Sequence, residues 1–475
     1  MNDQAPVTAT GETTTELKRV LSPGLLLLFI IGDVLGTGIY ALTGTVAKHV
    51  GGAVWVPFLL AFVVAFLTAF SYLELVTKYP QAAGAALYTH KAFGIHLLTF
   101  LVTFTVMASG ITSAATASRA FAQNLVKGFH LGSSQLLVTL LSIAFVLIIM
   151  GVNFWGVGHS MVTNVVLTLI ELSGLLLVIF VGIYAVTQGR ADFSQVAVFD
   201  TGQDKSVFLA VSAATSLAFF AMVGFEDSVN MAEETKNPST VFPKVMLTGL
   251  GITGVIYVLV SITAVALVPP GELSKQGATP LLQVVQVGAP NLPIGTIFPF
   301  ISMFAVANTA LLNMMMASRL LYGMSRERVL PGFLSKVHPT RRTPWVSIIF
   351  TTALAVVLIT FVGQVSQLGG TTALLLLAVF TIVNIAVLVL RKDQVEHHHF
   401  RTPAAVPAVA AVCTFYLVGP WTGRDLEQYW IAGVLLLLGL VLWLVESFFR
   451  KRHPETTLDM QFDNLDDFPG AEDLR

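Results

Sequence analysis

Charged residues are scarce in this chain of 475 residues. Asp, Glu, Lys and Arg make up 11% of it, whereas hydrophobic residues make up 55%. A water-soluble chain carries about 25% charged residues, so the composition argues against a soluble multidomain protein. There is one cysteine, Cys413, inside an apolar run, which excludes an internal disulfide and makes a disulfide-linked partner unexpected. The net charge of −1 gives no indication of nucleic-acid binding.

What the chain has instead is a series of apolar runs of about 20 residues, each long enough to cross a bilayer as a helix. They predict an all-α polytopic membrane protein with 12 transmembrane helices. The run at 403–419 is the weakest, because it is short and contains Pro403 and Pro407. The runs are 25–48, 54–78, 96–126, 135–156, 161–186, 208–234, 242–268, 298–325, 346–363, 365–392, 403–419 and 427–450.

The distribution of Lys and Arg sets the orientation. With the N-terminus in the cytoplasm, most basic residues fall in cytoplasmic loops, and an even number of spans returns the C-terminus there. We expect residues 1–22 and the acidic tail 453–475 to be disordered cytoplasmic segments of a plasma-membrane protein. On this assignment the outer side holds only Lys48, Lys127, Arg190, Lys205, Lys275 and Arg424.

Two of the runs are interrupted by glycines and acids. The first contains "GDVLGTGIYALTG", residues 32–44, and the sixth contains "FFAMVGFEDSVN", residues 219–230. Unwound backbone at this depth is tolerated only where protein or a water-filled cavity surrounds it. Opened amides at a half-helix N-terminus can bind a carboxylate, and opened carbonyls can accept from an ammonium, so the pair would suit an amino acid. Close helix packing at the glycines is the alternative.

The interrupted runs occupy corresponding places in two blocks of five spans, 23–186 and 208–392. The loop 187–207 joins the blocks on the outer side, and 393–452 adds two further spans. An odd number of spans inverts the second block in the membrane. Paired broken helices in such an inverted repeat mark a binding site near the bilayer midplane.

Four stretches of the chain follow one another in the order of the motifs of a known protein family. They are "GDVLGTGIYALTG" (32–44), "YLELVTKYPQAAGAALYTHKAFG" (72–94), "FFAMVGFEDSVNMAEETKNPSTVFPK" (219–244) and "SRLLYGMSRERVLPGFLSKVHPTRRTPWVS" (318–347). They resemble the amino acid–polyamine–organocation (APC) superfamily, in particular its cationic amino acid transporter-like branch. The resemblance implies the five-plus-five inverted-repeat fold of sodium-coupled neurotransmitter transporters and secondary active uptake of amino acids.

The resemblance also implies roles for residues at the two breaks. Gly36, Thr37 and Gly38 would present backbone amides to the substrate carboxylate. Carbonyls at the second break would accept from the substrate ammonium, and Phe225 would act as an aromatic lid, with ordinary packing as the alternative. The carbonyls are those of Phe220, Ala221 and Val223.

Glu171 marks a departure from the relatives. Asn164, Thr168 and Glu171 share one helix face, in the pattern N-x-x-x-T-x-x-E, where many proton-coupled relatives have Lys at the last place. A buried carboxyl can take up a proton near neutral pH, so we predict that Glu171 couples transport to protons and that Asp33 shares the role. A structural part for either acid, or a sodium site completed by Thr309 and Asn313 on 298–325, is the alternative.

Further charges gather near the inner ends of the spans and predict a salt-bridge network there, or a solvated interface. They are Glu74, Glu233, Glu234, Arg319, Arg326 and Glu327.

The leading interpretation is a proton-coupled amino acid importer in the lipid bilayer that works by alternating access and requires no cofactor or metal. An amino acid sensor, a polyamine permease and a sodium-coupled permease are the alternatives. A membrane enzyme is not predicted, because no nucleophile–base pair, metal motif or phosphate loop stands out. Lys, Arg or ornithine would follow from the resemblance, but no unpaired acid is clearly placed to receive a cationic side chain.

Overall fold

A computed structural model describes residues 22–452 with short gaps. The gaps are 82–83, 133, 156–160, 202–205, 233–234, 327–328, 342 and 396, and the side chains of 161–164 and 449–452 are likewise not described. The expected tails and Glu233, Glu234 and Glu327 therefore lie outside the described residues, as does the side chain of Asn164.

Every regular element of the described chain is helical. The α-helices are α1 (Pro23–Leu35), α2 (Thr37–Val50), α3 (Trp55–Lys78), α4 (Gly84–Phe93), α5 (His96–Gly128), α6 (Gln135–Trp155), α7 (Met161–Thr187), α8 (Val207–Ala218), α9 (Pro238–Leu267), α10 (Pro270–Leu273), α11 (Pro280–Gly288), α12 (Ile294–Arg326), α13 (Trp345–Phe361), α14 (Val365–Leu390), α15 (Ala405–Val418) and α16 (Leu426–Arg452). The 3₁₀ helices are η1 (Phe193–Gln195), η2 (Phe219–Met222), η3 (Phe225–Met231), η4 (Ser274–Gln276), η5 (Gly332–Ser335) and η6 (Pro420–Thr422).

The apolar helices fall where the hydrophobic runs predict them. Among the described residues, 10 helical segments are long and apolar enough to cross a membrane, counting α1 with α2 and α8 with η2 and η3 as one segment each. The other two expected spans correspond to the shorter apolar helices α13 and α15. This arrangement confirms a polytopic, all-helical membrane protein. The sequence analysis did not expect the short helices α4, α10 and α11 in the connections.

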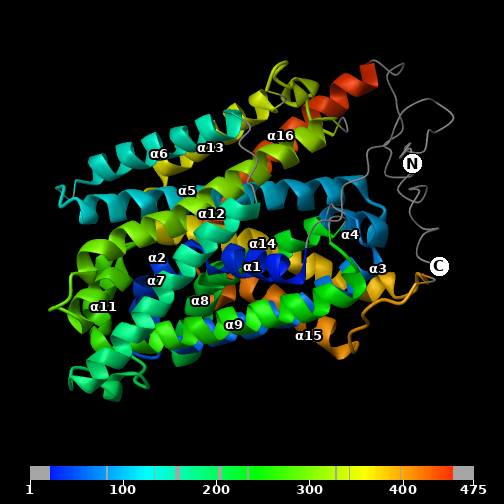
Figure 1. Ribbon diagram of the computed structural model, residues 1–475. Coiled ribbons are helices and arrows are strands. Elements are labelled where there is room, and N and C mark those ends of the chain that lie inside the picture. The colour runs from blue at the N-terminus through cyan, green and yellow to red at the C-terminus, as the bar shows by residue number, and fades with distance from the viewer. Residues whose placement is uncertain are drawn as a thin grey trace, which may run out of the picture.

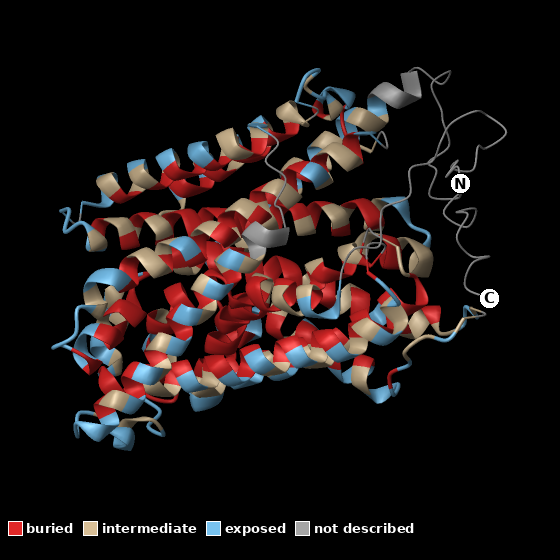
Figure 2. Ribbon diagram, in the orientation of Figure 1, coloured by how far each residue is buried: buried red, intermediate tan, exposed pale blue. Residues whose placement is uncertain are grey.

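The helices run side by side in an elongated bundle (Figure 1). The long helices α5 and α12 pack along each other, α1 packs on α7 and α9, and α2 packs on α8. Buried residues fill the interior around α1, α8 and α14, whereas α6 carries many exposed residues at the edge of the bundle (Figure 2). Apolar side chains such as Leu140 and Ile148 of α6 are exposed, as expected for a surface that meets lipid rather than water.

Glu74, near the end of α3, forms an ion pair. Its carboxylate accepts two hydrogen bonds from Arg391, at 2.9 Å from Nε and 2.8 Å from Nη2. The backbone N–H of Thr402 also donates to it. The partner of Glu74 is therefore Arg391, which the predicted network did not include. The pair fastens the connection between α14 and α15 to α3.

Candidate functional site

The first predicted break is present between α1 and α2. α1 ends at Leu35, and Gly36 has φ −11° and ψ −161°, outside the helical region, before α2 begins at Thr37. No side chain caps the new helix, so its first backbone amides carry the partial positive charge of a helix N-terminus. The hydroxyl of Thr37 is buried there and has no hydrogen-bond partner.

The second predicted break is longer. α8 ends at Ala218, and the chain continues through η2 and η3 instead of an α-helix. Between these two 3₁₀ helices, Val223 is extended and Gly224 has φ +126°. L-amino acids rarely adopt such a conformation, which explains glycine at this position. The break therefore extends over the described residues 219–231.

The two breaks touch each other. A Cβ added to Gly38 would stand 2.3 Å from the Cα of Ala221, and one added to Gly224 would stand 2.6 Å from the carbonyl oxygen of Asp33. The structure thus brings together the backbones of α2 and η2 and those of α1 and η3. Both the binding and the packing interpretations of these glycines require such proximity, and the roles assigned to them stay predictions.

Phe220 and Phe225 are buried beside the breaks. Phe220 packs against Gly369 of α14. Phe225 is fully buried, with its ring edge-on to Tyr72 at 5.7 Å and tilted to Phe380 at 5.4 Å between centroids. In this conformation Phe225 forms part of an aromatic cluster, as the packing interpretation expects.

Glu171 lies on α7 against the first break. One turn earlier, the Thr168 hydroxyl would be 1.8 Å from a Cβ on Gly32, so α7 and α1 are in close contact. The hydroxyl of Tyr40 donates to the backbone carbonyl of Glu171 at 2.6 Å. The carboxylate oxygens of Glu171 are both buried without a hydrogen-bond partner. An ionised carboxylate in such a place would lack all compensation for lost hydration.

Asp33 lies at the end of α1, against Gly224 of the second break. Its Oδ2 atom is also buried without a partner, and Glu171 is among the charged groups that act electrostatically on it. Thr309 of α12 lies beside Gly36, with its hydroxyl 2.9 Å from the position of an added Cβ. The Nδ2 atom of Asn313 donates to the Thr309 carbonyl at 2.9 Å, within α12.

Two further acids join this region, and the sequence analysis did not include them in the site. Glu226 of η3 is 7% exposed, and its Oε2 accepts from the backbone N–H of Gly224 at 2.9 Å. Asp227 is the next residue and is half-buried. Two negative charges about 5 Å apart repel by about 3 kcal/mol at an effective dielectric constant of 20. Ionising all of Asp33, Glu171, Glu226 and Asp227 together would therefore be costly.

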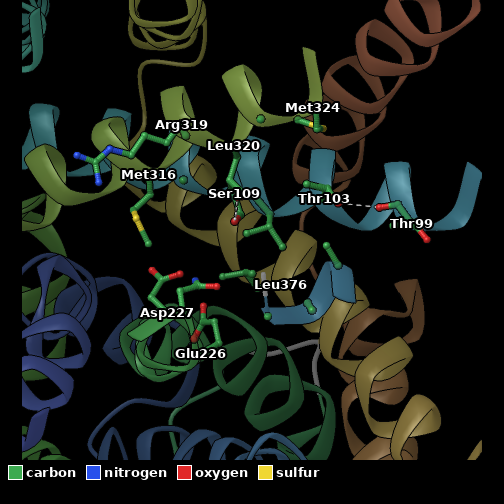
Figure 3. A pocket seen from close by; sticks show the side chains of 18 of the residues that line it. Thr99, Thr103, Ser109, Glu226, Asp227, Met316, Arg319, Leu320, Met324 and Leu376 are labelled. Atoms are coloured by element: carbon green, nitrogen blue, oxygen red, sulfur yellow. Dashed lines mark hydrogen bonds between the residues drawn. The ribbon is translucent and has the colours of Figure 1, made fainter. Parts of the chain in front are cut away.

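A cavity of about 770 Å³ extends from these acids to the surface (Figure 3). Asp227 and Glu226 lie on one side of it, and Met316 and Arg319 of α12 lie on the other. Its lining combines apolar groups with hydroxyls and amides, including Val223, Ser109, Asn313, Thr372 and Leu376. Arg319 and His96, both exposed, line it near the ends of helices that we predict to be cytoplasmic. Such a mixed cavity is typical of small-molecule sites.

Loops cover the opposite ends of the same helices. The backbone N–H of Gly52 donates to the Val198 carbonyl at 2.9 Å, and Trp55 donates to the Val196 carbonyl at 3.1 Å. The N–H of Ala278 donates to the Gln123 side chain at 2.7 Å. The structure therefore has its cavity on one side of the breaks and packed loops on the other. In the described part of the chain, no cluster of three or more His, Cys, Asp or Glu could hold a metal ion.

Comparison with known proteins identifies the family. Residues 25–453 match the family model described as amino acid permease. The chain belongs to the amino acid permease family. This finding confirms the predicted APC membership, and it confirms that the permease is a membrane transporter and not an enzyme.

Three relatives are named after different substrates. The permease is 30% identical to the methylthioribose transporter of Bacillus subtilis (strain 168), over 92% of this chain and 94% of the relative. It is 26% identical to the branched-chain amino acid permease BcaP of the same bacterium, with the same coverage of both chains. It is 27% identical to cationic amino acid transporter 3, mitochondrial, of Arabidopsis thaliana, over 79% of this chain and 63% of the relative.

Proposed function

We propose that this permease imports amino acids across the plasma membrane by alternating access, with both termini in the cytoplasm. The observation that carries the proposal is the direct contact of the two helix breaks, Gly38 against Ala221. In this proposal the amides of the first turn of α2 bind the carboxylate of a zwitterionic substrate, and carbonyls around η2 accept from its ammonium. We further propose that 23–186 and 208–392 form an inverted repeat, with these breaks as its paired discontinuous helices.

The driving ion in this proposal is the proton, carried by Glu171 with Asp33. A buried carboxylate without partners is strongly disfavoured unless it takes up a proton or a cation. Sodium is the competing ion, because the hydroxyls of Thr168 and Thr309 lie against α1 on either side of Asp33. Asn313 donates through Nδ2 to the Thr309 carbonyl, which leaves its Oδ1 atom as a further oxygen that a sodium ion could use.

The identity of the substrate is tested by counterflow measurements in proteoliposomes. We expect neutral or cationic amino acids to exchange, and we expect their methyl esters, which lack the carboxylate, to compete poorly. Polyamines should compete poorly for the same reason. Equal competition by acids and esters would contradict a carboxylate site at α2.

The identity of the driving ion is tested by measuring substrate accumulation in proteoliposomes under an imposed ion gradient. A pH gradient should drive uptake without sodium, and a proton ionophore should abolish it. Glu171→Gln should lose accumulation yet keep counterflow, whereas Glu427→Gln, an exposed acid at the start of α16, serves as the matched control. Undiminished proton-driven accumulation by Glu171→Gln would refute the coupling role.

A second candidate is a thioether sugar substrate. The 30% identity to a methylthioribose transporter favours it, although such a sugar has neither a carboxylate nor an ammonium for the two breaks. Methylthioribose therefore belongs in the counterflow panel. Exchange of methylthioribose but not of amino acids would replace the first proposal.

A further inference from the structure

Four carboxyl groups form a series on elements that pack on one another, α7 on α1 and α1 on η3. Glu171 lies on α7, Asp33 on α1, and Glu226 and Asp227 on η3. Asp33 has the central place, because it lies against Gly224, whose N–H binds Glu226, and its electrostatic neighbours include Glu171 and Asp227. Of these four, Glu226 and Asp227 line the cavity.

Gly224 is the point at which the deep and the open parts of the series meet. Its N–H holds the Glu226 carboxylate at 2.9 Å. The carboxyl carbon of Asp33 lies 3.1 Å from where a Cβ of Gly224 would stand. Because the glycine has no side chain, two carboxyl groups from different helices can approach the same residue. Any larger residue would separate them.

Few protein groups compete for the protons of these carboxyl groups. Both oxygens of Glu171 and Oδ2 of Asp33 have no hydrogen-bond partner. None of the hydrogen bonds or ion pairs found between described residues joins any of the four acids to Lys or Arg. Tyr72 is a further polar residue that lines the cavity. It is 1% exposed, and its hydroxyl has no hydrogen-bond partner. Unpaired buried polar groups of this kind are normally satisfied by water.

We propose that Glu226 and Asp227 are the exit station of the coupling proton, that is, the last protein groups that bind this proton before it enters the cavity. This inference rests on the proposed function, in which Glu171 and Asp33 carry that proton. In the first step, the O–H bond of protonated Glu171 breaks as ionised Asp33 accepts the proton, directly or through one water. Asp33 then passes it to an ionised carboxylate of η3. Water in the cavity finally accepts it as hydronium, and the η3 carboxylate is ionised again.

The two η3 acids have different parts in this route. Glu226 is almost fully buried and fixed by Gly224, which suits the acceptor nearest to Asp33. Asp227 is half-buried and points into the cavity (Figure 3), which suits release to water. Other titratable groups beside the series act as neighbours and not as carriers: Tyr40 and Tyr257 near Glu171, Tyr72 near Glu226, and Arg319 and His96 along the cavity.

The test separates proton movement from substrate movement. Wild type, Glu171→Gln, the double variant Glu226→Gln with Asp227→Asn, and the control Glu427→Gln are reconstituted with a pH dye trapped in the vesicles. Substrate-driven proton flux is followed by the dye, and substrate exchange by counterflow, which needs no net proton transfer. We expect the double variant to keep counterflow and to lose most of the substrate-driven proton flux.

The possible outcomes are distinct. Wild-type proton flux in the double variant, together with its loss in Glu171→Gln, overturns the exit station and leaves the proposed function standing. Undiminished flux in Glu171→Gln refutes the coupling role of Glu171 in the proposed function, on which this inference rests. Loss of counterflow in a double variant that still elutes as a monodisperse protein overturns the inference in favour of substrate binding by η3. Asp227→Glu, which keeps a titratable group, should retain the proton flux. Loss of flux in this variant also overturns the inference.

Discussion

Replacing Gly38 by Ala tests the contact between the two breaks directly. The new Cβ would stand 2.3 Å from Cα, 2.6 Å from Cβ and 2.8 Å from N of Ala221. Carbon atoms normally pack at about 3.5–4.0 Å, so the overlap exceeds roughly 1 Å and falls on backbone. A flexible side chain cannot relieve it, and α2 has to separate from η2.

The expected cost follows from this overlap. Overpacking of a tight site costs about 1–3 kcal/mol, and a backbone contact this short belongs at the upper end. If the contact exists only in the conformation described here, Gly38→Ala shifts the equilibrium away from that conformation by about 5- to 150-fold. Ala221→Gly should rescue the variant only in part, because it removes the Cβ but leaves the Cα in contact.

Two measurements check this prediction. The first is the counterflow rate beside Gly251→Ala, a helical substitution in α9 with no atom within 4 Å of the new Cβ, which should leave transport unchanged. The second is labelling of a cysteine placed at Ser109, which lines the cavity, after replacement of Cys413. We expect slower labelling in Gly38→Ala. Rates equal to those of Gly251→Ala in both assays would refute the packing argument.

Three further substitutions have expected outcomes. Gly224→Ala places a Cβ 2.6 Å from the Asp33 carbonyl oxygen at φ +126°, so counterflow should fall more than in Gly38→Ala, and equal rates would contradict this. Glu74→Gln removes the charge that pairs with the half-buried Arg391, which keeps only its hydrogen bond to the Thr402 carbonyl. This should destabilise the permease by up to about 3 kcal/mol, and an unchanged thermal midpoint in detergent would contradict the ion pair. Tyr40→Phe removes the 2.6 Å hydrogen bond to α7 and should cost about 1 kcal/mol, measured as a lower midpoint with counterflow retained.

The sequence predicted the features that depend on local pattern. Apolar runs gave the positions of the spans, and the glycines of the first and sixth runs gave the positions of the breaks. Both signals are local, because hydrophobic length and helix propensity act within a few turns of chain. The contact of Gly38 with Ala221 could not be predicted in this way, because it joins residues of two helices far apart in the sequence.

The acids of η3 show a second limit. In an α-helix the direction of a side chain follows from a period of 3.6 residues, but the chain through 225–231 is a 3₁₀ helix with a period of 3.0. A helical projection therefore points Glu226 and Asp227 in the wrong directions and gives no reason to place them in a cavity. The sequence analysis therefore left both acids out of the site, although both line the cavity.

The positions of contact and cavity together bear on the transport cycle. Where Gly38 meets Ala221, the two breaks leave no room for a substrate between them. The cavity reaches η3 and Val223 from one side only, while hydrogen-bonded loops cover the other side. A substrate that binds both breaks must therefore separate them, and the cavity side offers free space for that movement. In the proposed cycle, the described conformation thus corresponds to the state after release toward the cavity, in which the breaks have closed on each other.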